Sequence, residues 1–390
     1  MERVRVRHIA VVGSVLLALA GGLGACSSSS PDPAAPANTD AGTHKKDSGT
    51  PGTVSSSDAG GNNADDAGSL PPPVQDAAGL PLPAWDGGTV SVWPAPAQGV
   101  FMGAFVGVGM ESESDSDSEG LFTGEEALID RRWVIDNRFY DDSVDWVNDR
   151  TKWDIANHLV PMITWMPYGN GDPLDEIIAG THDAAITAQA QSAKALGAQI
   201  LMRWGHEMNG NWYPWAGANN GGADAGATGA ADKYVAAWKH VHDLFGQAGA
   251  TNVVWVWCIN VADVPEESWN HWSNYYPGDA YVDWVGLDAY NWGTSSSCCV
   301  WQSFSELVDS SYNDYAGKKP IMLPETASAE VGGDKAAWIN DMHQQIKTNY
   351  KAIHGVVWFD INKETDWRIA SSPATLASYK AMALDPYFSP

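Results

Sequence analysis

One stretch of the sequence decides the fold and carries the first candidate catalytic group: RWGHEMNGNWYPW, from Arg203 to Trp215. It follows a short apolar run, Gln199–Met202, that is typical of a buried strand. Glu207 therefore comes just after a strand end, beside the imidazole of His206, and is followed by amides, a glycine and aromatic rings. An acid, amides and flat rings are what a protein needs to hold a sugar and protonate its glycosidic oxygen. The alternative is a tryptophan-rich loop whose rings belong to the core.

A second carboxylate, Glu325, also follows a short apolar run, Pro320–Leu323. Glycoside hydrolysis normally uses two carboxyl groups on opposite sides of the scissile bond. Two strands of one sheet that each end in Glu can supply this pair, even when they lie far apart in the sequence. Other carboxylates compete for the second position, and the pattern alone does not choose among them: Asp288, Glu330, Asp360 and Glu364.

Apolar runs rich in Val, Ile, Trp and Phe recur between helix-like stretches, which predicts a parallel sheet. The helix-like stretches include His182–Leu196, followed by the helix stop Gly197, and also Ala231–Gly246 and Asp334–Tyr350. Eight alternations in about three hundred residues predict an α/β fold with one (β/α)8 barrel, a TIM barrel of ordinary size. The candidate strands are Val100–Val106, Val134–Asn137, Val160–Trp165, Gln199–Arg203, Asn252–Cys258, Trp284–Leu287, Pro320–Leu323 and Gly355–Phe359.

The catalytic face of such a barrel is formed by the carboxyl ends of its strands. The residues that we single out as candidates for a functional site all fall at predicted strand ends. They are Arg138, Trp165, Glu207, Asn260, Tyr290, Glu325 and Trp358.

The first 25 residues are typical of a bacterial lipoprotein signal peptide. A start with three arginines is followed by an apolar stretch, Ile9–Leu23, that is too short for a confident membrane span. The next residues, Leu23-Gly24-Ala25-Cys26, resemble a lipobox, in which cleavage leaves Cys26 as a lipid-modified first residue. We therefore expect an exported protein, anchored through Cys26 to the bacterial cell surface or outer membrane. The alternative is an ordinary secretory signal with a chance cysteine.

Residues 26–84 are dominated by Ser, Pro, Asp, Ala and Gly. Such a segment buries too little apolar surface to offset its chain entropy, so we expect a disordered tether before a catalytic domain over residues 85–390. The formal net charge is −26, from 48 acidic and 22 basic residues. This charge disfavours nucleic acids and anionic membrane surfaces as partners, whereas a neutral polysaccharide suffers no such repulsion.

The cysteines and histidines do not indicate a metal site. Cys26 is explained by the lipobox, and Cys258 ends a predicted strand as a buried thiol. The adjacent Cys298 and Cys299 either form a strained vicinal disulfide or one of them reaches elsewhere. No cysteine pair has zinc-type spacing and the histidines form no ligand cluster, so we expect no catalytic metal and no cofactor. The acidic stretch Glu111–Glu119 predicts a solvated loop in preference to a weak Ca²⁺ site.

The segment from His206 to Trp215 resembles the acid/base segment of glycoside hydrolase family 26. The resemblance extends from roughly residue 93 to the C-terminus. It implies a (β/α)8 barrel and a retaining mechanism, with Glu207 as acid/base after the fourth strand and Glu325 as nucleophile after the seventh. Further segments resemble the family in order: Arg138–Tyr140, Asn252–Trp257, Val282–Tyr290, Pro320–Ser328 and Gly355–Phe359.

The chemistry then assigns roles to the two glutamates. Glu207 must begin protonated, which requires surroundings and a nearby carboxylate that raise its pKa. Glu325 must begin ionised and needs donors, for which Tyr290 and Arg138 are the candidates. Tyr290 matches the family tyrosine that contacts the nucleophile, whereas Arg138 has an alternative role in a structural ion pair.

The remaining candidates would bind the substrate. His206 could donate a hydrogen bond to a sugar hydroxyl beside the cleaved bond. Trp212 and Trp358 match family aromatics that form sugar platforms. Trp165, Trp215 and Trp292 could extend the cleft, and Asn260 lies at a strand end on the same face.

The expected function is a retaining, endo-acting hydrolase of a β-linked plant-type polysaccharide, either β-1,4-mannan or β-1,3-1,4-glucan. The segment Met208–Trp215 looks closer to the branch of the family that includes β-1,3-1,4-glucanases, and β-1,3-xylan is a third possibility. A rival hypothesis is a surface polysaccharide-binding protein that keeps the tryptophan platforms without catalysis. The expected partners are the polysaccharide and, through the lipid on Cys26, a membrane, but no nucleic acid; we expect a monomer.

Overall fold

The computed structural model describes residues 93–107, 115–167, 173–226, 229–297 and 299–389. Its eight parallel strands form one closed barrel in chain order, so the predicted (β/α)8 architecture is confirmed. The strands are β1 (Phe101–Val106), β2 (Ile135–Asp141), β3 (Val160–Met166), β4 (Ile200–Trp204), β5 (Val253–Asn260), β6 (Trp284–Asn291), β7 (Ile321–Ser328) and β8 (Ile353–Asp360).

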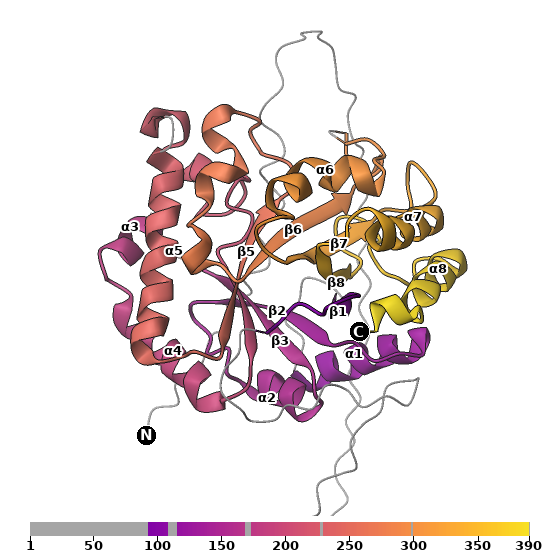
Figure 1. Cartoon of the computed structure of the whole chain (residues 1–390), viewed down its shortest axis with the longest axis horizontal. Helices are drawn as coiled ribbons and strands as arrows, with labels where there is room; N and C mark the ends of the chain where they lie inside the picture. The colour runs from indigo at the N-terminus through magenta and orange to yellow at the C-terminus, as the bar shows by residue number, and fades with distance from the viewer. Residues whose placement is uncertain (1–92, 108–114, 168–172, 227–228, 298, 390) are drawn as a thin grey trace, which may run out of the picture. The chain divides into compact units, whose positions relative to one another are not determined.

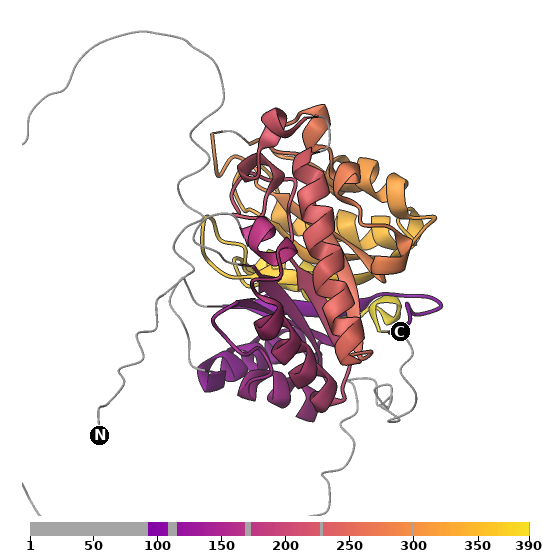
Figure 2. The ribbon, with the colours of Figure 1, turned by 90° about the vertical axis from the view of Figure 1, so that its left-hand side faces the viewer.

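Helices surround the strands in sequence order, and the longest of them, α5, runs along one flank of the barrel (Figures 1 and 2). The helices are α1 (Asp115–Ile129), α2 (Asp149–Ala156), α3 (Pro173–Ile178), α4 (Asp183–Leu196), α5 (Gly229–Ala248), α6 (Phe304–Tyr315), α7 (Lys335–Thr348) and α8 (Pro373–Ala383). Short 3-10 turns occupy the loops after β4 and β5: Gly217–Asn219, Gly222–Ala225, Ser268–Asn270, Trp272–Tyr275 and Asp279–Tyr281. A last one, Pro386–Phe388, follows α8.

Local sequence explains where several helices begin and end. A capping box formed by Ser303 and Glu306 starts α6, and Asp334 caps α7 by accepting from a backbone N–H. Gly197 ends α4 in the left-handed conformation, at φ 69°. The three helices predicted from the sequence are confirmed, with ends that differ by at most two residues.

Four strands run two or more residues further than the sequence predicted, and the first of them is β2, which ends at Asp141. β5 extends to Asn260, β6 to Asn291 and β7 to Ser328. Asn260, Tyr290 and Glu325 are therefore held within strands and not in the loops that follow them. Strands define side-chain direction more tightly than loops do, so this extension fixes the groups at the carboxyl end of the barrel.

β7 contains one residue more than its neighbour over a short span. Leu323 pairs with Val356 and Thr326 pairs with Trp358. Between these two pairs β7 has two residues, whereas β8 has one. The irregularity lies at Pro324 and Glu325, where proline in any case provides no ladder donor. An extra residue reverses the alternation of side chains, and this turns Glu325 toward the barrel interior on a strand whose regular alternation would point it outward.

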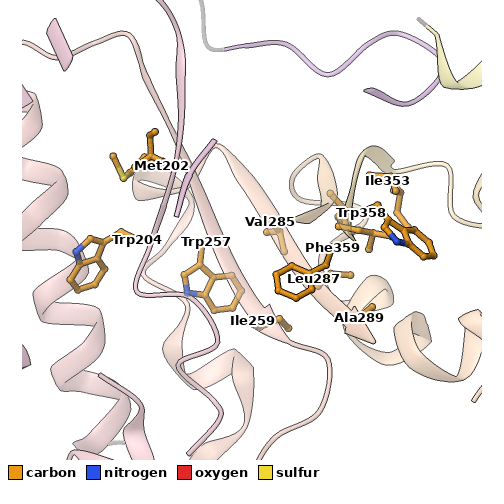
Figure 3. Close-up of a cluster of buried hydrophobic side chains, with 14 of the residues drawn as sticks. Met202, Trp204, Trp257, Ile259, Val285, Leu287, Ala289, Ile353, Trp358 and Phe359 are labelled. Carbon is orange, nitrogen blue, oxygen red and sulfur yellow. The ribbon is translucent and has the colours of Figure 1, made fainter. Parts of the chain in front are cut away.

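The apolar core has two parts. The first fills the amino-terminal half of the barrel interior, where Trp93 stacks on Phe101 and Trp284 with ring centroids 4.4 and 5.5 Å away. The second lies between the strands and the helices, where alternate strand residues such as Trp204 and Trp257 project (Figure 3). Trp204, for example, packs against Trp238 of α5, with 5.9 Å between the two ring centroids.

Several predictions from the sequence fall on residues outside the described ranges, including the signal peptide, the tether, Cys26 and Cys298. Within the described ranges, no helix is long and apolar enough to cross a membrane. The acidic stretch Glu111–Glu119 is described only from Asp115, where α1 begins. Its second half therefore starts a helix, and the prediction of a loop is wrong for these residues.

Candidate active site

Glu207 is presented by a tight backbone turn directly after β4. Gly205 and Glu207 both have φ 52°, in the left-handed region that non-glycine residues seldom occupy. The turn is fixed by hydrogen bonds from the Gly205 N–H to the Trp165 carbonyl and from the Glu207 N–H to the Cys258 carbonyl, each 3.0 Å long. Left-handed non-glycine residues tend to cluster at functional sites, where the surrounding structure holds them in place.

The Glu207 carboxyl accepts hydrogen bonds from two neutral donors. Trp212 Nε1 lies 2.8 Å from one oxygen, and Asn260 Nδ2 lies 3.1 Å from the other. Burial and the charge of Glu325 raise the pKa of Glu207 to about 7, against the lowering effects of Arg203, Trp212 and Asn260. Glu207 is therefore suited to hold a proton near neutral pH.

The Glu325 carboxyl has different partners. The Tyr290 hydroxyl donates to one oxygen and the Arg203 guanidinium to the other, each at 2.5 Å. Unlike Glu207, this carboxyl is therefore paired with a buried cation, in a charge-assisted hydrogen bond. The predicted contact between Tyr290 and Glu325 is confirmed, and Trp212 and Asn260 lie beside Glu207 as expected for residues of one site.

Arg203 is a central residue of the site that the sequence analysis quoted but gave no role. It is fully buried, and besides Glu325 it contacts Asp288 and donates to Thr164 Oγ1 at 3.2 Å. Although burial opposes it, the charges of Asp288 and Glu325 hold the pKa of Arg203 well above its usual value. The alternation of side chains along the strand could have identified it. Arg203 lies two residues after Leu201, which faces the barrel interior, so Arg203 faces the interior as well.

The rival carboxylates have other functions in the structure. Asp288 is fully buried and faces Arg203, so it is a partner of the guanidinium. Glu330 accepts from Ser371 and Thr375. Asp360 accepts from the Ile369 backbone, and Glu364 accepts from Trp367 Nε1. Among these candidates, Glu325 is the carboxylate that shares the site with Glu207.

Arg138 does not contact Glu325, so its predicted role is wrong. Its guanidinium pairs with Asp136 and donates to the Val106 carbonyl. Asn137 and Phe139 face the barrel interior, where they meet Thr164 and His206. Arg138, between them on β2, projects to the opposite side, as the alternation of a strand requires.

Three of the tryptophans predicted to bind sugar, Trp358 as a platform and Trp165 and Trp215 as extensions of the cleft, are buried. Trp165 and Trp358 occupy strand positions that point toward the helices. Trp165 packs against Phe245. Trp358 packs against Trp338 and Tyr379. Trp215 is fully buried and donates to the His206 carbonyl. The prediction is wrong for these three residues, whereas Trp212 and Trp292 are half-buried and keep exposed surface.

His206 is also buried and does not face solvent. One ring nitrogen, Nε2, lies 2.9 Å from the Tyr213 hydroxyl. Burial and the nearby Arg203 charge lower the pKa of His206 well below its usual value, so the ring is neutral. The predicted direct contact with a sugar hydroxyl is not available to this ring, and its accessible neighbour is the half-buried Tyr213, which the sequence analysis did not single out.

The last features of the site to consider are the thiol of Cys258 and the metal-binding capacity of the described residues. Cys258 is a buried thiol, as predicted, and burial raises its pKa well above the usual value. In the part of the chain that the structure describes, no group of three or more His, Cys, Asp or Glu residues could hold a metal ion. The site thus consists of one carboxyl suited to carry a proton and one suited to carry a negative charge.

The interaction between the two carboxyls can be tested by replacing Glu325 with Gln. Removal of a neighbouring negative charge favours ionisation of Glu207, so the pKa of Glu207 should fall below about 7. The pKa is measured by NMR titration of ¹³C-labelled glutamate side chains. Glu330→Gln, which removes a carboxylate outside the site, is the matched control and should leave the pKa of Glu207 in place. An unchanged or higher pKa in Glu325→Gln would show that the two groups do not interact.

Solved structures of mannanases share this fold. The match to a structure of a Bacillus subtilis mannanase has a TM-score of 0.52 at 19% identity, and it covers 74% of this chain and 86% of the other. The match to a β-mannanase of Bacteroides ovatus has a TM-score of 0.53 at 14% identity, covering 75% and 90% of the two chains. At these identities the likeness supports the fold alone.

Sequence relatives give a more specific result. The chain is 40% identical over 286 residues to Endoglucanase H of Acetivibrio thermocellus, covering 72% of this chain and 30% of the relative. It is 28% identical over 166 residues to mannan endo-1,4-beta-mannosidase A and B of Caldalkalibacillus mannanilyticus, covering 42% of this chain and 28% of the relative. The chain thus spans less than a third of the length of either relative.

The model of glycosyl hydrolase family 26 matches residues 172–367, which is half of the chain and includes both Glu207 and Glu325. The chain therefore belongs to glycosyl hydrolase family 26.

Proposed function

We propose that the protein is a retaining, endo-acting glycoside hydrolase of a β-linked polysaccharide. The observation that carries this proposal is the contrast between two carboxyls of one site. Glu207 is buried among neutral donors with its pKa raised to about 7, whereas Glu325 accepts from a cation and a phenol. A protonated acid and an ionised nucleophile are the pair that double displacement requires.

In the first step, a Glu325 oxygen attacks the anomeric carbon and the glycosidic C–O bond breaks. The proton of Glu207 passes to the departing oxygen, which leaves as a hydroxyl. The product is an ester between the sugar and Glu325. In the second step, the Glu207 carboxylate takes a proton from water while the water oxygen attacks the anomeric carbon. The ester C–O bond then breaks and the starting state of both glutamates returns. Two inversions preserve the β configuration.

The other side chains of the site support these steps. Arg203 and Tyr290 stabilise negative charge on Glu325 before attack and on its departure from the ester. Trp212 and Asn260 orient the Glu207 carboxyl. Because Trp212 donates to Glu207 and keeps exposed surface, its ring is the best candidate for a platform under the sugar that leaves.

Within this proposal, a β-1,3-1,4-glucan is the favoured substrate and β-1,4-mannan the second. The relative at 40% identity is named an endoglucanase, whereas the mannosidases match at 26% to 30% identity. Proteins named β-1,3-xylanases match at 20% and 21% identity, which makes β-1,3-xylan the weakest of the three.

A catalytically inactive polysaccharide-binding protein is the alternative function. It would need exposed rings such as Trp212 and Trp292, but not an acid with a raised pKa or a carboxylate paired with Arg203. Burying such charged groups costs free energy, and a protein that only binds sugar would gain nothing from them. This cost favours the enzyme.

The substrate proposal is tested with a panel of polysaccharides. Barley β-glucan and lichenan should lose viscosity quickly and release reducing ends, because internal bonds are cleaved. Glucomannan and galactomannan should be cleaved more slowly, and β-1,3-xylan least. Glu325→Ala, which lacks the nucleophile, is the matched control and should be inert on all of them. Cleavage of galactomannan with β-glucan untouched would make the protein a mannanase, and binding without any cleavage would make it a binding protein.

We also propose that the protein is exported and anchored through a lipid on Cys26, on the basis of the lipobox-like residues before it. Cells grown with labelled palmitate should incorporate label into the wild-type protein and into the matched variant Ser27→Ala. Cys26→Ser should incorporate none, because it lacks the thiol that would carry the lipid. Equal labelling of Cys26→Ser would remove this proposal.

A further inference from the structure

We infer that Asn209 is a positioning residue that holds the Asn260 side chain against the carboxyl of Glu207. The inference concerns the acid/base group of the proposed function and rests on that function for its catalytic meaning. Its physical basis is a set of hydrogen bonds from the loop after β4 to the last residue of β5 and to the loop that follows it.

The Asn209 side chain is fully buried and makes hydrogen bonds to both backbone groups of Asn260. Its Nδ2 donates to the Asn260 carbonyl at 2.8 Å, and its Oδ1 accepts from the Asn260 N–H at 3.0 Å. The same Nδ2 donates to Asp263 Oδ1 at 2.8 Å, which orients the amide. Every polar atom of this side chain is therefore used.

These bonds replace a missing piece of the β-sheet. The pairing of β4 with β5 ends at Met202 and Trp255, although β5 continues to Asn260. On the β6 side, Asn260 still pairs with Asp288. On the β4 side, the Asn209 amide supplies a donor and an acceptor to Asn260, as a neighbouring strand would. The last residue of β5 is thus held on both sides.

Asn260 in turn contacts the catalytic acid. Its Nδ2 donates to Glu207 Oε1 at 3.1 Å, while its Oδ1 accepts from the Ala262 N–H at 2.9 Å. The amide therefore has one orientation, with its donor toward Glu207. A donor to a carboxylate favours the ionised form, so loss of this bond should raise the pKa of Glu207.

The backbone of Asn209 completes the connection. Its carbonyl accepts from the Val264 N–H at 2.9 Å and from Asn270 Nδ2 at 2.7 Å. Asn209 also lies two residues after Glu207 in the chain. These backbone bonds remain possible in Asn209→Ala, so that variant removes only the side-chain bonds that hold Asn260.

The experiment compares Asn209→Ala, Asn260→Ala and the double variant. Asn220→Ala is the matched control, because it removes another buried amide of the loop after β4, one that donates to the Pro214 and Ala216 carbonyls. The pKa of Glu207 is measured by ¹³C-NMR titration, together with the pH profile of kcat/KM on the polysaccharide and the unfolding temperature. If Asn209→Ala does not fold, Asn209→Ser replaces it with the same expected direction.

Asn209→Ala and Asn260→Ala should raise the pKa of Glu207 by similar amounts, and the double variant should raise it no further. The basic limb of the pH profile should move to higher pH by the same amount, since it reports the loss of the Glu207 proton. Asn220→Ala should lower the unfolding temperature without moving the pKa of Glu207.

A raised pKa in Asn260→Ala but not in Asn209→Ala would overturn the inference and leave Asn209 as a structural tie between loops. The NMR titration needs no turnover, so its result holds separately from the proposed function. A pKa shift in a protein that cleaves none of the polysaccharides would support the positioning role and contradict the hydrolase.

Discussion

The site depends on one buried cation. Arg203 lies inside the barrel and contacts both Glu325 and Asp288, so the positive charge is placed on one side of the site. Glu207, by contrast, accepts hydrogen bonds only from the neutral donors Trp212 and Asn260 among the described residues. This unequal distribution of charge gives two glutamates of the same chemistry different surroundings, one paired with a cation and the other with a raised pKa. Breaking a buried ion pair by removing one partner costs about 3–5 kcal/mol, so Arg203 also constrains the fold.

The fold was largely predictable because eight apolar runs and the helices between them follow the periodicity of a (β/α)8 barrel. The candidate site was predictable in part. Glu207, Trp212, Asn260, Tyr290 and Glu325 come together as expected, since parallel strands bring their carboxyl ends to one face. Trp165 and Trp358 were assigned wrongly because position along a strand was used without its alternation. Counting from a known inward residue would have placed them toward the helices and Arg203 toward the site.

Two features could not be read from the sequence. The extra residue in β7 reverses the direction of Glu325; Pro324 is compatible with a bulge at this point, but the strand pairing is what shows the change of direction. The environment of His206 is the second, since its neutrality depends first on burial and then on the charge of Arg203, three residues earlier in the chain. Both features depend on how the strands and the loops after them pack in the barrel, which local patterns do not encode.

The assignment of the two glutamates is tested most directly by azide rescue of Glu207→Ala and Glu325→Ala on an aryl glycoside. The aryl leaving group needs no proton, so Glu207→Ala should form the glycosyl ester and then wait for a base. Azide needs no base and should restore turnover of Glu207→Ala, giving a β-glycosyl azide. Glu325→Ala cannot form the ester and should not yield that product. Rescue of Glu325→Ala to an α-glycosyl azide, with no rescue of Glu207→Ala, would contradict the account and reverse the two roles.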